Sequence, residues 1–203
     1  MINFFITIPI LGIITAFLGV IIEQLLAAVA SILWQKELVF SFYNNLAPFL
    51  IASALIEEVL KYSAIYFIIK NKLAFQGLRL ALASLLVGLF WSLTEVLLII
   101  ITQPQSASAL FSFNSAIFLS AIFIILLHTL TAFTMGVILS TEAFSKYFFS
   151  IRVVLLTTFI HLLFNFLIIQ QGNFTNALAG IIFSFVFIVD LIILAFDFKF
   201  LKK

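Results

Sequence analysis

Seven polar side chains of the kinds used in catalysis lie within long apolar segments of this chain. An ionisable side chain near the centre of a bilayer costs about 2.5–3.5 kcal/mol, so such residues usually face the interior of a helix bundle and have a role there. Glutamate and histidine transfer protons, activate water and bind divalent metal ions, and lysine can neutralise a carboxylate. The candidate site residues are Glu57, Glu58, Lys61, Glu95, His128, His161 and Asn165.

The segments around these residues are typical of a membrane protein. Hydrophobic residues make up 65% of the 203 positions and charged residues only 9%, which is outside the range of a soluble globular domain. Six apolar segments are long enough to cross a bilayer and lack the alternation of a strand. They cover residues 4–33, 46–69, 78–101, 112–139, 151–169 and 174–196. The sequence therefore predicts an all-α polytopic membrane protein: one membrane domain over residues 1–203, a bundle of about six transmembrane helices, with the candidate catalytic helices within 46–169.

Composition also limits the chemistry and the partners. The chain has no cysteine, which excludes a disulfide, a thiolate metal site and a cysteine nucleophile. Its net charge of +2 indicates no nucleic-acid partner, whereas its apolar character makes the lipid bilayer its surroundings.

The distribution of basic residues predicts the topology, because short cytoplasmic loops are enriched in Lys and Arg. With six crossings, eight basic residues fall on one side of the membrane and only Lys36 falls on the other. The eight are Lys70, Lys72, Arg79, Lys146, Arg152, Lys199, Lys202 and Lys203. We therefore expect an integral, multi-pass membrane protein with both termini in the cytoplasm.

The candidate residues fall at similar depths. Counted at about 1.5 Å per residue from the flanking basic residues, four of them lie roughly 14 to 24 Å from the cytoplasmic boundary. These four are Glu57, Glu95, His128 and His161. We expect them to line one polar cavity. The same count puts Glu23 at roughly 30 Å, near the outer surface and outside the site.

Spacing within the helices points the same way, since residues three or four apart share a face. Lys61 lies one turn from both Glu57 and Glu58, and Asn165 lies one turn from His161. Lys61 is roughly 13 Å from the interface, too deep to reach water easily, so we expect it to contact a glutamate directly. An inert ion pair would explain this trio but not the deep glutamate and histidines of the other helices.

Two further polar residues have plausible structural roles. Asp190 has no polar neighbour nearby in sequence, so we expect it to hydrogen-bond a neighbouring helix. Asn165 could equally form an ordinary hydrogen bond between helices or belong to the site.

Four motifs occur in order along the candidate helices: Glu57-Glu58-Val59-Leu60-Lys61, Trp91-Ser92-Leu93-Thr94-Glu95, His128 with Gly136, and His161-Leu162-Leu163-Phe164-Asn165. Together they resemble the PrsW family of intramembrane peptidases. The family belongs to a wider group that includes the CAAX prenyl endopeptidases and bacteriocin-immunity membrane proteins. The resemblance covers residues 46–169. Trp91 stands where the family more often has Phe, and Tyr62 stands where the CAAX enzymes have arginine, so a prenylated substrate is not expected.

The resemblance implies an enzyme, a membrane-embedded peptidase that hydrolyses a membrane protein or peptide substrate. It implies that Glu57 is the general base and that Glu58 orients it or Lys61. Peptide hydrolysis also needs a bound water and a stabilised oxyanion. For these the resemblance implies Glu95 with His128, and His161 with Asn165.

The charge of the site leaves the cofactor question open. Three glutamates and one lysine in a low dielectric favour either a shared proton or a bound cation. A shared proton gives a glutamic peptidase, and we expect no cofactor on this interpretation. The alternative is Zn²⁺ held by His128, His161 and a glutamate, with Glu95 as the candidate.

Two other classes of function fit the same residues. A transporter or proton-relay protein would also carry intramembrane glutamate and histidine, although the chain has no internal repeat and no glycine-broken helix. A non-catalytic immunity or assembly factor would keep the fold without hydrolysis.

The topology is testable with reporter fusions. Reporters fused after Gln105 and after Gly172 are expected outside the membrane, and reporters fused after Lys72, Lys146 and Lys203 inside. Alkaline phosphatase and fluorescent-protein fusions measure these positions. A reporter on the wrong side would contradict six crossings.

Overall fold

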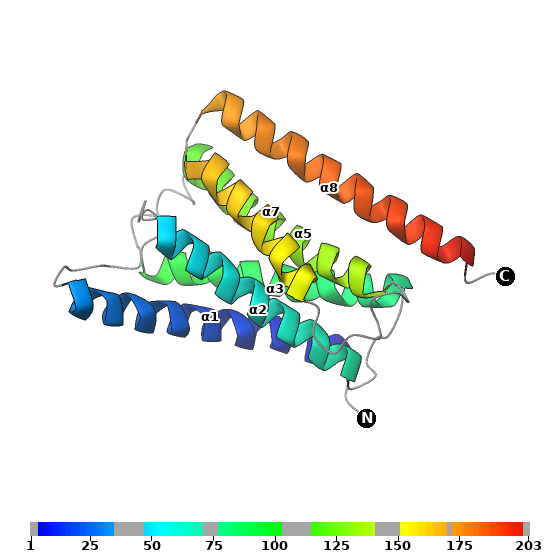
Figure 1. Cartoon of the computed structure of the whole chain (residues 1–203), viewed down its shortest axis with the longest axis horizontal. Coiled ribbons are helices and arrows are strands. Elements are labelled where there is room, and N and C mark those ends of the chain that lie inside the picture. Colours follow the sequence, from blue (N-terminus) through cyan, green and yellow to red (C-terminus); the bar gives the residue numbers. More distant parts are fainter. Residues whose placement is uncertain are drawn as a thin grey trace.

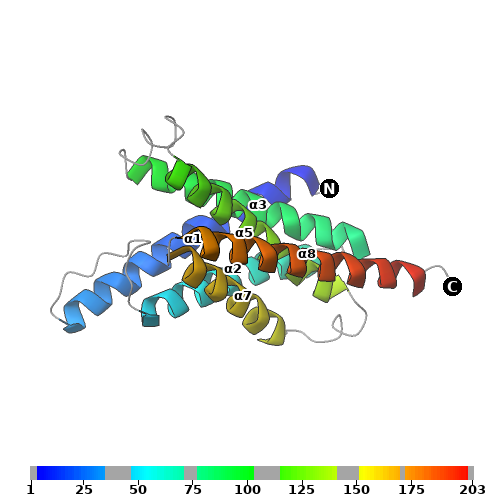
Figure 2. The ribbon, with the colours of Figure 1, turned by 90° about the horizontal axis from the view of Figure 1, so that it is seen from above.

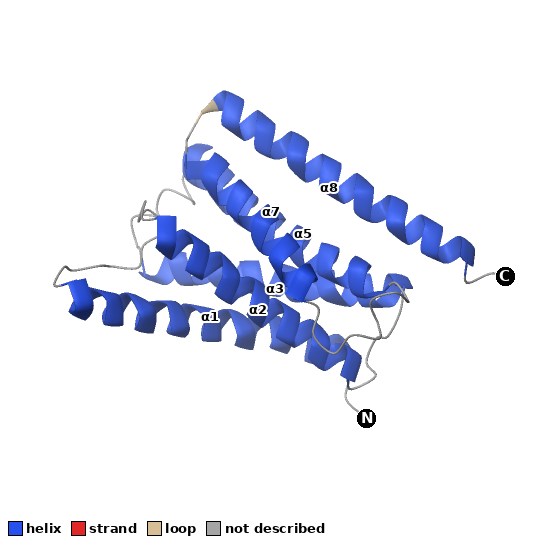
Figure 3. Ribbon diagram, in the orientation of Figure 1, coloured by secondary structure: helices blue, strands red, loops and turns tan. Residues whose placement is uncertain are grey.

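The structure, a computed structural model, describes residues 4–34, 47–70, 77–102, 115–140, 151–169 and 172–200. These residues form six helices and no strand. Figure 3 colours the described residues by secondary structure and shows their helices in blue. The helices are α1 (Phe4–Trp34), α2 (Ala47–Lys70), α3 (Gly77–Thr102), α5 (Ser115–Ser140), α7 (Ile151–Ile169) and α8 (Asn173–Phe200). The all-α prediction is confirmed. Helices are the expected form, because in lipid every backbone polar group must be satisfied within its own segment.

Four of the helices contain stretches that are long and apolar enough to span a membrane. The stretches are Ile6–Val29, Gly77–Thr102, Phe118–Ser140 and Phe174–Phe196. Helix α7 carries a shorter apolar stretch, Ile151–Leu167. Helix α2 has 24 residues, or about 36 Å, and so is also long enough, but it carries three ionisable residues near its middle. The lengths and composition are those of a membrane-protein bundle.

The helix carrying Glu57 and those carrying the other candidate residues form the centre of the bundle. Figure 1 shows α1 and α8 on opposite sides, with α2, α3, α5 and α7 between them. The most extensive contact joins α3 and α5; α7 packs against α2 and α5, and α1 packs against α2 and α3. Seen from above, α8 runs over α5 and α7 (Figure 2), the two helices with which it makes most of its contacts. All the candidate site residues therefore come from the four central helices.

Small residues bring α3 and α5 together. A Cβ atom added to Gly88 would collide with the backbone of His128 and lie 2.7 Å from Ala132 Cβ. A Cβ atom added to Gly136 would collide with the side chain of Ser84. Small residues allow close backbone approach in membrane bundles. The close approach at Gly88 fixes His128 against α3, which also carries Glu95.

The largest apolar cluster among the described residues lies on one side of the candidate residues. Its buried residues include Tyr62, Ile65 and Ile68 of α2, Leu80 of α3 and Met135 of α5. On their own helices, these residues lie on the side of the candidate residues that we predict to be cytoplasmic. The cluster therefore packs beside the candidate site, in a region where polar residues such as Ser84 and Thr157 are also buried.

The close contact of α3 and α5 predicts how two glycine variants behave. Gly88→Ala is expected to lower the free energy of unfolding by about 1–3 kcal/mol, because the added methyl group overpacks a rigid contact. Gly180→Ala in α8 is the matched control, since no atom lies within 4 Å of its added Cβ. Its higher helix propensity should leave stability equal or slightly raised. Unfolding of the detergent-solubilised proteins measures both, and equal stability of the two variants would contradict the contact.

Candidate active site

The structure brings six of the seven predicted site residues into one buried cluster. Helix α2 contributes Glu57, Glu58 and Lys61, α3 contributes Glu95, and α5 and α7 contribute His128 and His161. Both histidines of the chain are therefore in this cluster. The predicted convergence of Glu57, Glu95, His128 and His161 is confirmed by these contacts.

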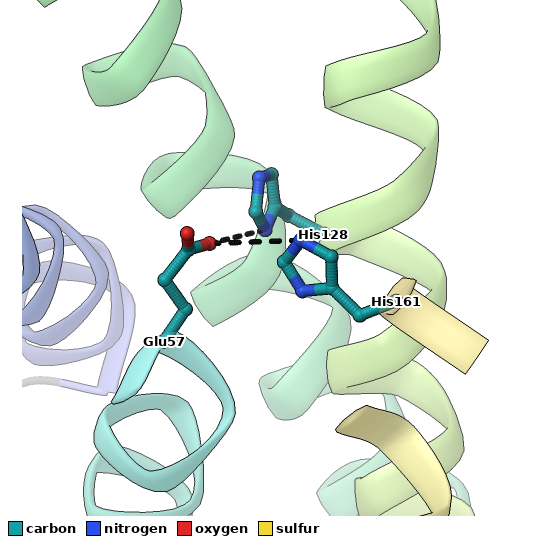
Figure 4. Close-up of side chains that lie close together, drawn as sticks. All are labelled: Glu57, His128 and His161. Atoms are coloured by element: carbon teal, nitrogen blue, oxygen red, sulfur yellow. Dashed lines mark ion pairs between the residues drawn. The ribbon is translucent and has the colours of Figure 1, made fainter. Parts of the chain in front are cut away.

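Three donor atoms face one another at the centre of the cluster. Glu57 Oε2 lies 3.6 Å from His128 Nδ1 and 3.9 Å from His161 Nε2. Figure 4 shows these three side chains pointing toward one another from three helices. All three atoms lie within 4.8 Å of one another. The separations exceed a hydrogen bond but leave room for one small species between the atoms.

Two of the three central atoms have unused hydrogen-bonding capacity. Glu57 Oε2 and His128 Nδ1 are buried and have no hydrogen-bond partner within the described part of the chain. A buried polar group without a partner costs about 1–3 kcal/mol, more if it is charged. An arrangement of this kind therefore favours a bound water or cation at the centre.

Each histidine presents its other ring nitrogen to a carboxylate. His161 Nδ1 lies 2.8 Å from Glu58 Oε1, and His128 Nε2 lies 2.6 Å from Glu95 Oε2, although the second contact is not aligned as a hydrogen bond. The two rings meet edge to face, with centroids 5.1 Å apart. The hydrogen bond to Glu58 orients the His161 ring, and Glu95 lies against the far edge of His128, so that the remaining nitrogens of both rings face Glu57.

The candidate metal-binding group differs in one member from the prediction. His128 and His161 are present as predicted, but the carboxylate that shares the centre with them is Glu57. Glu95 approaches His128 from the opposite edge of the ring. The sequence could not separate these two glutamates, because both lie at the right depth and the choice depends on how α2 and α3 are rotated about their axes.

Lys61 contacts a glutamate directly, as predicted, and the partner is Glu58. Lys61 Nζ lies 2.5 Å from Glu58 Oε1 and donates a hydrogen bond of 3.1 Å to Thr131 Oγ1. The ammonium group also lies 5.6 Å from the centre of the Trp91 ring. The side chains of Lys61 and Glu58 are both completely buried. This ion pair is the innermost part of the site.

Thr131 is a site residue that sequence reasoning missed. Its Oγ1 lies 3.2 Å from Glu58 Oε1, in addition to accepting from Lys61. Thr131 comes three residues after His128, on the same face of α5. That spacing was the available signal, but threonine is common in membrane helices and carries no charge that would mark it.

Glu23 is not part of the central group, as predicted, but it lies closer to that group than the residue count implied. Ser53 Oγ lies 2.5 Å from Glu23 Oε1 and 2.9 Å from Glu57 Oε1, so a hydroxyl connects Glu23 to Glu57, which Glu23 also contacts directly. Helix α1 has 31 residues, about 46 Å, and is longer than the hydrocarbon core of about 30 Å. A count along such a helix places its later residues too far out. Ser53, one turn before Glu57, was also missed.

The predictions for Asp190 and Asn165 have different outcomes. Asp190 accepts a hydrogen bond of 2.7 Å from Thr134, which joins α8 to α5 as expected. Asn165 is half-buried, and it forms no hydrogen bond or ion pair with the cluster residues that the structure describes. Its assignment to the site stays a prediction.

Searches against models of protein families, against curated proteins and against solved structures give no match for this chain. The resemblance to the PrsW family therefore depends on the four motifs alone. What the site can do must be argued from its geometry.

The buried ion pair predicts a large loss of stability when its cation is removed. Lys61→Met should lower the free energy of unfolding by about 3–5 kcal/mol, because Glu58 would stay buried without its closest counter-charge. Lys61→Arg keeps the charge but not the shape, so it should fall between the wild type and Lys61→Met.

Lys70→Met is the matched control, since Lys70 is on the same helix but exposed. It should change stability little. Unfolding curves in detergent measure the three variants. Equal effects at the two lysines would mean that the ion pair does not stabilise the bundle.

Proposed function

We propose that this chain is a membrane-embedded peptidase that hydrolyses a peptide bond in a membrane protein or membrane-bound peptide. The observation that carries the proposal is the meeting of Glu57 Oε2, His128 Nδ1 and His161 Nε2 around a space for one small ligand. A water molecule held there would have a carboxylate to accept its proton and two imidazoles to orient it. The four motifs that resemble the PrsW family support the same reaction.

The roles follow from what each side chain contacts. Glu57 accepts a proton as the water oxygen bonds to the carbonyl carbon of the substrate, and the C–N bond then breaks as the nitrogen takes up that proton. A ring N–H of His128 or His161 can donate to the oxyanion that forms on the carbonyl oxygen. Glu58 is unsuited to the base role, because its Oε1 already contacts Lys61, Thr131 and His161.

Burial supports the same division between the two adjacent glutamates. The side chain of Glu58 is fully buried, whereas the side chains of Glu57 and Glu95 are 12% and 11% solvent-exposed. Glu57 and Glu95 therefore mark the side of the cluster that solvent or substrate can approach. Glu58 and Lys61 form its closed side.

A metal-dependent version is the second candidate, and one observation favours it. Metal-binding histidines usually have a carboxylate at the other ring nitrogen, and both histidines here do. Glu57, His128 and His161 make up the two-histidine, one-carboxylate set of many zinc hydrolases, so the residues fit the ion. When bound, Zn²⁺ supplies a Lewis acid that polarises the carbonyl and acidifies water.

A proton relay or transporter is less well supported. Outside the six cluster residues, Asp190 is the one Asp, Glu, Lys, Arg or His side chain that is buried among the described residues, and it bonds Thr134. The buried ionisable groups therefore form one compact cluster and do not continue as a series along the bundle, as a proton pathway would need.

Loss of the proposed base gives a direct test. Glu57→Gln keeps the shape of the side chain but cannot accept the proton, so cleavage should fall at least about 100-fold with folding unchanged. New protein N-termini in membranes of cells expressing the wild type or the variant measure cleavage and identify the substrate. Asp190→Asn is the control, because Asp190 is a buried carboxylate on α8 that bonds Thr134, away from the centre.

Purified wild-type and variant proteins distinguish the metal-dependent peptidase, the glutamic peptidase and the non-catalytic factor. Bound zinc in the wild type that is lost in His128→Ala supports the metal-dependent version, and full cleavage by metal-free protein supports the glutamic one. New N-termini that also appear with Glu57→Gln, or in neither case, would contradict the peptidase and favour the non-catalytic factor.

A further inference from the structure

A chain of three side chains joins the outer helix α1 to the centre of the site. Ser53 Oγ lies 2.5 Å from Glu23 Oε1 on α1 and 2.9 Å from Glu57 Oε1, one turn further along α2. The contact with Ser53 engages only one oxygen of Glu57. The other oxygen, Oε2, is the atom that faces the two histidines.

Holding one oxygen of Glu57 determines where the other points. A free glutamate side chain samples several rotamers, and ordering it costs up to about 1.5–2 kcal/mol. A carboxylate whose Oε1 is fixed by a hydroxyl presents Oε2 in one direction. Hydrogen bonds of this kind orient the groups that bind metals or activate water.

The hydroxyl of Ser53 links the carboxyl groups of Glu23 and Glu57. A serine hydroxyl has one hydrogen to donate and can accept others. Ser53 lies at hydrogen-bonding distance from two carboxyl oxygens, so one of the two carboxyl groups must supply the hydrogen for the second contact. A glutamine at position 23 could supply it from its amide.

The packing of α1 brings Glu23 to this position. Gly19, one turn earlier on the same face, lets α1 approach the Trp91 ring so closely that an added Cβ would lie 3.1 Å from two ring atoms. Ala27, one turn later, is buried, whereas the neighbouring Gln24 is exposed. Glu23 therefore belongs to the face of α1 that packs against the bundle.

We propose that Glu23 and Ser53 are positioning residues that hold Glu57 so that its Oε2 faces His128 and His161. The proposal rests on the proposed function, since it assigns a purpose to the orientation of Glu57. Helix α1 thereby orients Glu57 without contributing a side chain to the group formed by Glu57, His128 and His161.

Four variants test the proposal: Glu23→Leu, Glu23→Gln, Ser53→Ala and the double variant Glu23→Leu/Ser53→Ala. Gln24→Leu is the matched control on the next, exposed position of α1. The readouts are formation of the new N-termini and the affinity of the purified protein for Co²⁺, a spectroscopic probe for the two-histidine, one-carboxylate group. Unfolding in detergent is recorded for every variant.

Glu23→Leu should lower cleavage or Co²⁺ affinity by about 10- to 100-fold, the usual effect of removing a residue that orients a ligand. Glu23→Gln should recover most of that loss, because its amide can donate to Ser53, and Gln24→Leu should have no effect. Since Glu23, Ser53 and Glu57 are in mutual contact, the effects of Glu23→Leu and Ser53→Ala should be less than multiplicative in the double variant.

Three results would overturn the proposal. These are equal effects of Glu23→Leu and Gln24→Leu, a loss in Glu23→Gln as large as in Glu23→Leu, and independent effects of the two substitutions that multiply in the double variant. If the wild type neither cleaves nor binds Co²⁺, the proposed function fails by itself. The unfolding data then decide on the contact, because purely additive stability losses would mean that Glu23 and Ser53 do not interact.

Discussion

One carboxylate oxygen, Glu58 Oε1, holds three helices of this bundle together at their most buried point. It contacts Lys61 on its own helix, Thr131 on α5 and His161 on α7. An ion withdrawn from water loses several kcal/mol of hydration, which is recovered only when other charges and hydrogen bonds replace it. The buried lysine therefore requires Glu58, and Glu58 requires the donors that surround it. The remainder of the site is arranged around this pair.

The two adjacent glutamates of α2 have opposite surroundings. Glu58 Oε1 meets Lys61, Thr131 and His161, whereas Glu57 Oε1 meets the hydroxyl of Ser53; the second oxygen of each has no hydrogen-bond partner in the described structure. Successive helix positions point about 100° apart, so neighbours in sequence can face a closed and an open environment. The pair thus separates a structural charge from one that is free to react. Such a division suits catalysis, because a base that is already saturated with donors accepts a proton poorly.

Close helix packing allows polar groups on separate helices to meet at these distances. Gly88 lets α3 approach the backbone that carries His128, and Gly19 lets α1 approach Trp91. In lipid there is no hydrophobic force between helices comparable to that in water, so such contacts depend on shape and on interhelical hydrogen bonds. The Thr134–Asp190 bond makes the corresponding polar contact for α8, at a distance from the site.

The sequence alone determined the helices, the convergence of the polar residues of four helices and the kind of partner that Lys61 requires. These follow from quantities that do not depend on the fold: the length of an apolar run, the rise of 1.5 Å per residue and the cost of an isolated charge in lipid. Tertiary structure decided which glutamate pairs with Lys61 and that Glu57, not Glu95, shares the centre with the histidines. It also brought in Glu23 through Ser53. Each of these outcomes depends on the rotation and tilt of whole helices, which are set by packing at sites such as Gly88 and Gly19 and cannot be read from spacing along a single segment.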